Sequence, residues 1–465
     1  MHVTFAAATA GPSHLPPPLL RVALIAASSG LLLGFNTAVV SGAMPSLQLT
    51  WALGPTSYGL IVSGLLIGAI VGAFAGGRLA DDLGRRDVIM ATAAVFALGN
   101  FCSGLAPSPA YIVGGRLIVG FAVGVISVVA PLYLAEISPR RYRGRIVGLY
   151  QLAITLGILC AYVLDAVRGL QPHEWREMFM SGAALAGALG IAALLLPDSP
   201  RWMLLHDDEQ EARSILVRLG TVEVDSVIEE LREGIDRERM EPAPARPLPF
   251  LRSPAGIGVA LFFFQQLGGI NVVIYFFPTM MMRVGLSWGD HALTSAISLG
   301  LLNCLLTVAA LALVDRIGRR KLAMWSLAGM SVSLLILSLG EWLYARDIAE
   351  EAIEFMLLAG FVSYIGWFAV GMGPVCWIVI SELYPLRKRG AQMSIPVMAH
   401  WTFNLVVSGS LPYILSIGIT AYAFLGYALI AACGWWWARR FMPETMGLSL
   451  EKISAGGAVH KGFHP

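Results

Sequence analysis

Charge is scarce in this sequence. Asp, Glu, Lys and Arg make up 13% of its 465 residues, against 57% that are hydrophobic. A soluble domain carries about 25% charged residues, so the shortage excludes an ordinary soluble protein. The formal net charge is +2 and the sequence has no basic tract, so we expect no nucleic-acid partner.

Cysteines and catalytic groupings are also few. The five cysteines, Cys102, Cys160, Cys304, Cys376 and Cys433, all fall within apolar runs. They have neither metal-ligand spacing nor the pattern of a disulfide framework, so we expect no metal site and no cofactor. The apolar runs contain no paired carboxylates and no activated nucleophile, which argues against an enzyme embedded in a membrane.

Long apolar runs are what the sequence has instead. About 20 apolar residues cross the hydrocarbon core of a bilayer, and hydropathy gives about twelve such segments here. The sequence therefore predicts an all-α membrane protein, and its 50 glycines fit helices that approach one another closely. The segments lie near residues 21–43, 57–79, 88–106, 110–134, 146–168, 177–197, 255–282, 291–314, 322–344, 353–380, 391–415 and 418–441.

Basic residues gather in alternate loops between these segments. Loops near 44–56, 104–110 and 415–418 have none. The positive-inside rule then places both termini in the cytoplasm. The basic residues of the inner loops are Arg78, Arg85, Arg86, Arg140, Arg141, Arg143, Arg145, Arg316, Arg319, Arg320, Lys321, Arg387, Lys388 and Arg389.

One long polar stretch, residues 198–252, divides the chain. Apolar residues at helical spacing within 205–219 and 223–240 predict short amphipathic helices on the cytoplasmic face. Residues 1–20 have no Lys or Arg before the first apolar run, which argues against a cleaved signal peptide. We expect a flexible cytoplasmic lead (1–20), a six-helix bundle (21–197), a linker (198–252), a second six-helix bundle (253–442) and a cytoplasmic tail (443–465).

The sequence repeats itself across that linker. GRLADDLGRR at 77–86 reappears as LVDRIGRR at 313–320, and EISPRRYRG at 136–144 reappears as ELYPLRKRG at 382–390. PDSPR at 197–201 has a weaker counterpart in PET at 443–445. Repeats of this kind place a substrate site between the halves, near the middle of the bilayer.

The repeated motifs combine acids with arginines, which form bidentate pairs. Paired across the seam between the halves, they would hold the inner mouth closed. The arginines alone would also follow from the positive-inside rule, but acids contribute little to orientation, so the fixed acids favour a latch. The predicted cytoplasmic gate comprises Asp81, Arg85, Arg86, Glu136, Arg143, Asp198, Arg201, Asp315, Arg319, Arg320, Glu382, Arg389 and Glu444.

These motifs, with QQLGGIN at 265–271 and GPVCW at 373–377, resemble those of the sugar porters of the major facilitator superfamily. The resemblance covers roughly residues 21–450 and implies twelve transmembrane helices in two six-helix bundles, with short cytoplasmic helices between them. It also implies sugar transport by alternating access. Asp198 stands where the family usually has Glu, a conservative departure.

Uncharged amides and aromatic residues lie inside the apolar segments. An amide in hydrocarbon needs partners: it can bond a neighbouring helix, or it can match sugar hydroxyls without adding charge. Gly268 and Gly269 should weaken the helix beside Gln265, Gln266 and Asn271, and Tyr275 lies one turn beyond Asn271. The resemblance implies sugar contacts at Gln151, Gln265, Gln266, Asn271, Asn303, Trp377, Trp401 and Asn404. We add Tyr275, Gly373 and His400, the last at a position where relatives vary among amides.

Coupling to protons is the remaining question. Arg116 lies within the fourth apolar segment, and it either serves function or extends toward the outer interface. In proton-coupled sugar porters an aspartate on the first helix faces this arginine, whereas this sequence has Asn36 at that position. An amide does not titrate. Asp165 and Glu341 fall near the outer ends of their helices, so the sequence favours facilitated diffusion.

Two rivals remain open. A proton–sugar symporter would use another acid, such as Asp165, and a sugar-sensing receptor would carry a long cytoplasmic tail, which 443–465 is not. The expected partners are a monosaccharide and the lipid bilayer. Glucose is the first candidate, with xylose and galactose next, and relatives generally act as monomers. The composition suggests a bacterial inner membrane.

Overall fold

The computed structural model describes residues 15–168, 173–240, 250–274, 291–346, 350–385, 389–448 and 450. Within them the protein is almost entirely helical, as predicted. The first half contains α1 (Pro17–Ala27), α2 (Ser29–Trp51), α3 (Pro55–Leu83), α4 (Arg85–Gly104), α5 (Pro109–Ile137), α6 (Arg143–Arg168) and α7 (Glu174–Ala193). Because α1 and α2 together form one broken span, this half contains six spans.

The linker and the second half follow. The linker forms α8 (Pro200–Leu205), α9 (Glu209–Arg218) and α10 (Val224–Met240), the last two within the ranges predicted for amphipathic helices. The second half contains α11 (Pro254–Gln266), α13 (His291–Ile317), α14 (Arg319–Tyr344), α15 (Glu350–Val370), α16 (Met372–Glu382), α17 (Arg389–Ser416) and α18 (Thr420–Phe441). Two 3-10 turns, η1 (Arg140–Tyr142) and η2 (Phe250–Arg252), precede α6 and α11.

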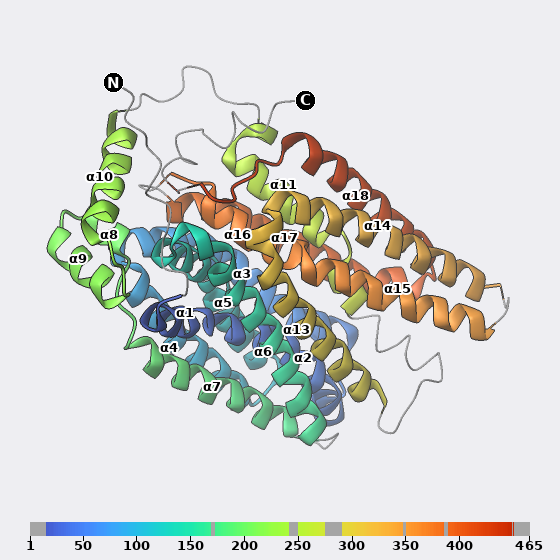
Figure 1. The fold of residues 1–465 in the computed structure, drawn as a ribbon. Helices are drawn as coiled ribbons and strands as arrows, with labels where there is room; N and C mark the ends of the chain where they lie inside the picture. The colour runs from blue at the N-terminus through green and yellow to red at the C-terminus, as the bar shows by residue number, and fades with distance from the viewer. Residues whose placement is uncertain are drawn as a thin grey trace.

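Ten helical stretches of the described chain are long and apolar enough to cross a membrane. The predicted sixth and eleventh segments correspond to α7 and α17, which are helices of 20 and 28 residues. The first half (blue to green) and the second half (yellow-green to red) lie beside each other in Figure 1, with α3 packing against α17 and α6 against α13. The helices α8, α9 and α10 lie at one end of the bundle, which we call the linker end (Figure 1).

Glycines set how closely the helices of the first half pack. A Cβ atom at Gly68 or Gly72 of α3 would collide with the backbone of α5, and one at Gly120 or Gly124 of α5 would collide with the backbone of α3. Small residues bring helix backbones together in membranes, which explains part of the high glycine content.

Three spans are interrupted within the part of the chain that the structure describes. The first bends at Ser28, between α1 and α2, and the tenth breaks at Gly371, between α15 and α16. In the seventh, α11 ends at Gln266 and a helical turn resumes at Ile270, with Gly269 at a φ of +89°. The predicted break at Gly268 and Gly269 is thus confirmed, and it separates the paired glutamines from Asn271.

Candidate functional site

Each half carries a buried ion pair at the linker end. The Nε atom of Arg85 lies 2.9 Å from a carboxylate oxygen of Glu136, and Nη2 of Arg319 lies 3.2 Å from one of Glu382. All four side chains are 1% exposed. Each arginine also lies near the aspartate four residues before it, at 3.5 Å from Asp81 and 3.0 Å from Asp315.

A carboxylate that follows the last span of each half caps the helix that begins with the arginine. Asp198 accepts the backbone N–H of Arg85 at 3.1 Å, and Glu444 accepts those of Arg319 and Arg320 at 3.0 and 3.1 Å. An anion at a helix N-terminus satisfies N–H groups that have no partner within the helix. Burial raises the pKa of Asp198, while its bonds from the N–H groups of Ser199 and Arg85 oppose that rise.

Two aspartates accept backbone hydrogen bonds across the seam between the halves, where Arg145 also lies 3.9 Å from Asp315. Asp81 of α3 accepts the N–H of Ala391 at 3.0 Å, at the start of α17. Asp315 of α13 accepts the N–H groups of Gly144 and Arg145 at 3.1 and 2.9 Å, at the start of α6. Each half therefore caps a helix of the other, and the linker end is joined by hydrogen bonds.

This arrangement corrects one expectation from the sequence. The Arg85–Glu136 and Arg319–Glu382 pairs lie within one half each, not across the seam. The reason is geometric, because each arginine begins a helix that packs beside the glutamate of its own half. The other predicted gate arginines bond backbone carbonyls: Arg86 that of Leu194, Arg143 that of Leu448, Arg201 that of Glu136, Arg320 that of Arg439 and Arg389 that of Tyr384.

Arg116 and Asn36 meet inside the first half. Nη1 of Arg116 donates to the backbone oxygen of Asn36 at 2.9 Å, and the two residues are 1% and 0% exposed. The side-chain nitrogen of Asn36 donates to the oxygen of Leu32 in its own helix, at 2.9 Å. Its Oδ1 atom is buried and has no hydrogen-bond partner within the described chain.

The amide cluster forms in the second half. Asn271 Nδ2 donates to Gln266 Oε1 at 2.9 Å, and Gln266 Nε2 donates to Gln265 Oε1 at 3.2 Å. Gln265 Nε2 donates in turn to the backbone oxygen of Met372 at 2.8 Å, and Gln266 Nε2 lies 3.1 Å from Nδ1 of His400. Four predicted residues from two spans thus form one network.

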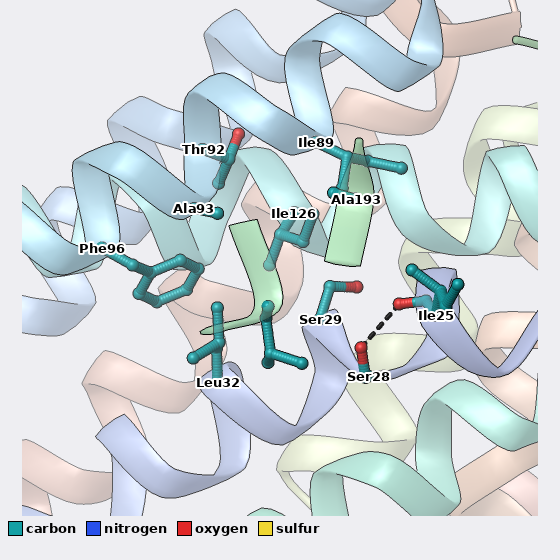
Figure 2. Close-up of a pocket in the computed structure, with 11 residues that line it drawn as sticks. Ile25, Ser28, Ser29, Leu32, Ile89, Thr92, Ala93, Phe96, Ile126 and Ala193 are labelled. Atoms are coloured by element: carbon teal, nitrogen blue, oxygen red, sulfur yellow. Dashed lines mark hydrogen bonds between the residues drawn. The ribbon is translucent and has the colours of Figure 1, made fainter. Parts of the chain in front are cut away.

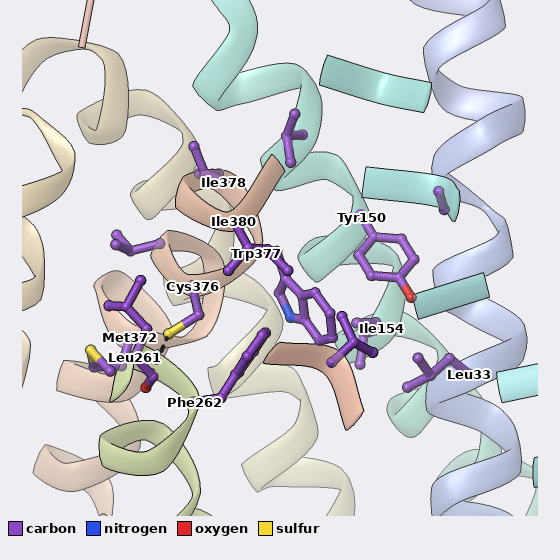
Figure 3. Close-up of a cluster of buried hydrophobic side chains, with 14 of the residues drawn as sticks. Leu33, Tyr150, Ile154, Leu261, Phe262, Met372, Cys376, Trp377, Ile378 and Ile380 are labelled. Carbon is purple, nitrogen blue, oxygen red and sulfur yellow. Dashed lines mark hydrogen bonds between the residues drawn. The ribbon is translucent and has the colours of Figure 1, made fainter. Parts of the chain in front are cut away.

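Aromatic rings line this cluster. The ring of Trp377 lies 5.0 Å from that of Phe262 and 5.5 Å from that of Tyr150, both edge-on. In Figure 3, Tyr150 reaches from α6 toward Trp377, so both halves contribute to this group. Gln151, next to Tyr150, belongs to the same place, since a Cβ at Gly373 would lie 3.5 Å from its Nε2 atom.

The remaining predicted residues are not joined to the network. The Oδ1 atom of Asn303 accepts from Thr307 of its own helix at 3.5 Å, and that of Asn404 accepts from Ser408 of its own helix at 3.0 Å. Trp401 touches the group through the ring of His400, at 4.8 Å. Tyr275 lies outside the described residues.

Four contributors were not predicted from the sequence: Tyr150, which neighbours the predicted Gln151, and Phe262, Tyr364 and the Met372 carbonyl. Phe262 precedes Gln266 by one helical turn, so the spacing could have identified it. Tyr364 of α15 donates to the oxygen of Gly268 at 2.7 Å and so holds the break in the seventh span. The Met372 carbonyl follows the break at Gly371. Sequence patterns contain no signal for the last two contacts, because both depend on how the tenth span packs against the seventh.

A hollow inside the first half lies apart from this cluster, between α1, α2, α4, α5 and α7 (Figure 2). Its lining is apolar except for Ser28, Ser29 and Thr92. Ser28 and Ser29 donate to carbonyls of α1 and Thr92 donates to a carbonyl of its own helix, each at 2.6 Å. The hollow therefore lacks the convergent polar groups that a sugar needs.

The family follows from comparison with known proteins. A family model described as "Sugar (and other) transporter" matches residues 22–456. The chain is a sugar porter of the major facilitator superfamily. It is 34% identical over 431 residues to the glucose transporter GlcP of Staphylococcus epidermidis, covering 92% of this chain and 95% of GlcP. It is 33% identical, also over 431 residues, to the D-xylose transporter of Levilactobacillus brevis, covering 92% and 93%.

Solved structures agree with this assignment. The proton:xylose symporter XylE bound to 6-bromo-6-deoxy-D-glucose matches with a TM-score of 0.86 and 29% identity, over 95% of this chain and 99% of that one. XylE from E. coli in its inward open conformation matches with a TM-score of 0.71 and 28% identity, over 94% and 99%. The predicted fold and family of this sugar porter are confirmed, and its relatives are transporters, not enzymes.

Proposed function

We propose that this sugar porter carries a monosaccharide, glucose first among the candidates, down its concentration gradient without coupling to protons. One observation carries the proposal: Arg116 is buried against Asn36, an amide, and its Nη1 donates to the backbone oxygen there. A carboxylate beside an arginine can exchange its ion pair for a proton as its surroundings change. An amide cannot, so the porter has no proton carrier at this position.

The amide network supports a neutral, hydroxyl-bearing substrate. Amides donate and accept without adding charge, and the rings of Trp377, Phe262 and Tyr150 suit the C–H face of a sugar. We assign sugar contact to the three amides of the network, Gln265, Gln266 and Asn271, and to Gln151. The relatives GlcP and the xylose transporter are described as carrying glucose and xylose, and galactose stays a candidate because its hydroxyls can be met by the same amides.

Alternating access supplies the proposed transport cycle. The positive-inside rule favours the linker end as the cytoplasmic side, so the Asp81 and Asp315 bonds across the seam would close the inner mouth. Opening it requires those bonds to break. The higher TM-score with sugar-bound XylE than with its inward open form supports a closed inner mouth. We expect the porter to work as a monomer in a bacterial inner membrane, with both termini cytoplasmic.

The experiment is counterflow in liposomes with a panel of monosaccharides, followed by Asn36→Asp. The wild type should exchange glucose at rates that do not depend on an imposed pH gradient, and Asn36→Asp should make exchange depend on pH. Asn100→Asp is the matched control. Asn100 is also fully buried, its Nδ2 donates one turn back to Phe96 at 3.0 Å, and its Oδ1 has no partner within the described residues. Equal pH dependence in both variants would remove Arg116 from the explanation.

A proton–sugar symporter is the second candidate, because one carboxylate does touch the first span. Asp165 of α6 is half-buried, and a Cβ at Gly42 of α2 would collide with its carboxylate. If the wild type accumulates sugar under a pH gradient, Asp165→Asn should abolish the accumulation and leave exchange intact.

A further inference from the structure

The hydrogen bonds of the amide network all run in one direction, which the backbone carbonyl of Met372 determines. A carbonyl oxygen only accepts, so Gln265 must present its amide nitrogen to the backbone oxygen of Met372, at 2.8 Å, and to that of Gly373, at 3.5 Å. The oxygen of Gln265 then faces Gln266, which must present its own nitrogen at 3.2 Å. The oxygen of Gln266 is thereby turned toward the nitrogen of Asn271, at 2.9 Å.

The same direction fixes the proton on His400. Its Nδ1 atom lies 3.1 Å from the nitrogen of Gln266, which is a donor and not an acceptor. A hydrogen bond forms only if Nδ1 carries no proton, so the ring is neutral and its proton is on Nε2. Both N–H groups of Gln266 then have acceptors, one in Gln265 and one in His400.

Aromatic packing keeps the imidazole in this orientation. The ring of His400 lies 4.7 Å from that of Phe262, 5.3 Å from that of Trp377 and 4.8 Å from that of Trp401. The side chain is 7% exposed. A ring enclosed on several sides cannot turn over without moving its neighbours, so Nδ1 stays directed at Gln266.

We infer that His400 is a positioning residue that determines whether Gln266 donates a hydrogen bond to the sugar or accepts one from it. It occupies the second N–H of Gln266, so Gln266 offers a sugar only the remaining lone pair of its Oε1 atom. A sugar hydroxyl that meets Gln266 must therefore donate its proton. This inference deepens the proposed sugar site and depends on it. It names the substrate class as monosaccharides with a free hydroxyl at that position, and it excludes sugars in which that hydroxyl is alkylated or replaced.

Nitrogen NMR of the full-length porter labelled with ¹⁵N-histidine tests the proton directly. A neutral ring with the proton on Nε2 gives separate signals for the bare and the protonated nitrogen. The porter has eight histidines, and the signals that vanish in His400→Gln belong to His400. We expect the Nε2–H form without sugar. A proton on Nδ1, or a charged ring at neutral pH, would overturn the inference whichever sugar the porter carries.

Two variants separate the acceptor from the ring. His400→Gln loses the ring but retains an oxygen that can accept from Gln266, whereas His400→Phe retains the aromatic packing and loses the acceptor. We expect Phe to raise the KM for sugar about three- to tenfold, the equivalent of one net hydrogen bond, with little change in maximal rate or melting temperature. Gln should stay within about threefold of the wild type. The opposite ranking would assign the role to packing and contradict the inference.

Sugar analogues complete the test. At the hydroxyl that meets Gln266, a fluoro analogue can accept but not donate, so in the wild type it should bind as weakly as the deoxy analogue. In His400→Phe the freed N–H of Gln266 can donate to fluorine, so the fluoro analogue should bind more tightly than the deoxy analogue. A wild type that prefers fluoro to deoxy at every position would contradict the inference. No exchange of any sugar by the wild type would instead refute the proposed function and leave the NMR result valid.

Discussion

The two halves of this porter match at the linker end and differ in the middle of the membrane. At the linker end, Arg85, Glu136 and Asp198 have equivalents in Arg319, Glu382 and Glu444: in each half the arginine pairs with the glutamate, and the third residue accepts the backbone N–H of the arginine. In the middle, the first half has Arg116 against Asn36, whereas the second half has the amide network. We interpret the shared part as the machinery that closes the inner mouth. We assign the proposed sugar binding and the lack of proton coupling to the unshared part.

The largest expected effect tests whether the matched ion pairs are equivalent. Arg85→Ala leaves Glu136 buried without its main partner, and Arg319→Ala does the same to Glu382. Breaking a buried pair costs about 3–5 kcal/mol, so both variants should lower the melting temperature strongly and by similar amounts. The measurement is thermal unfolding of the purified porter in detergent.

The control for this prediction removes both partners at once. The double variant Arg85→Leu, Glu136→Leu should have a higher melting temperature than Arg85→Ala, because no uncompensated charge stays buried. A strong effect in one half and none in the other would break the proposed equivalence of the linker ends.

A middle-sized effect is expected where the halves pack differently. A Cβ at Gly72 would meet the backbone of Phe121 in α5, while a Cβ at Gly366 of α15 would lie 3.5 Å from the end of the Leu306 side chain. Overpacking costs about 1–3 kcal/mol. Gly72→Ala should therefore destabilise the porter, and Gly366→Ala should be neutral or stabilising in the same thermal assay. Equal losses would mean that backbone contact does not hold α3 to α5.

The smallest effect concerns the seam. Asp81→Ala removes the cap from the start of α17, and Asp315→Ala removes the cap from the start of α6. Losing a cap costs about 1 kcal/mol, so hydrogen–deuterium exchange should rise several-fold at Ala391 in the first variant. It should rise similarly at Gly144 and Arg145 in the second variant. Ser394→Ala, which removes an acceptor for the N–H of Gly77 at 3.2 Å, should raise exchange at Gly77 and leave the other two sites unchanged.

Much of the fold follows from the sequence alone, because each span needs a long apolar run and because a repeated sequence predicts the same helices in both halves. The break was predictable from the adjacent glycines Gly268 and Gly269, and the correspondence between the two sets of charged residues was predictable from the repeated motifs. The partners of those charges were not. Spacing shows that Asp81 recurs as Asp315, but it does not show that each carboxylate caps a helix of the other half.

The candidate site shows the same limit. The residue types of Gln265, Gln266 and Asn271 predicted a cluster, whereas its direction depends on the Met372 carbonyl, a backbone atom that any residue supplies. The sequence predicted His400 as a sugar contact, and only its distance to Gln266 gives it a positioning role. Asn303 and Asn404, predicted by the same reasoning, bond within their own helices instead.

The central claim is that transport runs downhill, and accumulation in liposomes tests it most directly. The purified porter is placed in vesicles with an inward proton gradient, and labelled glucose is followed until its internal concentration is constant. We predict that the internal concentration equals the external one, with or without the gradient. Accumulation above the external concentration, collapsed by a protonophore, would contradict the account and show that Asn36 does not prevent coupling.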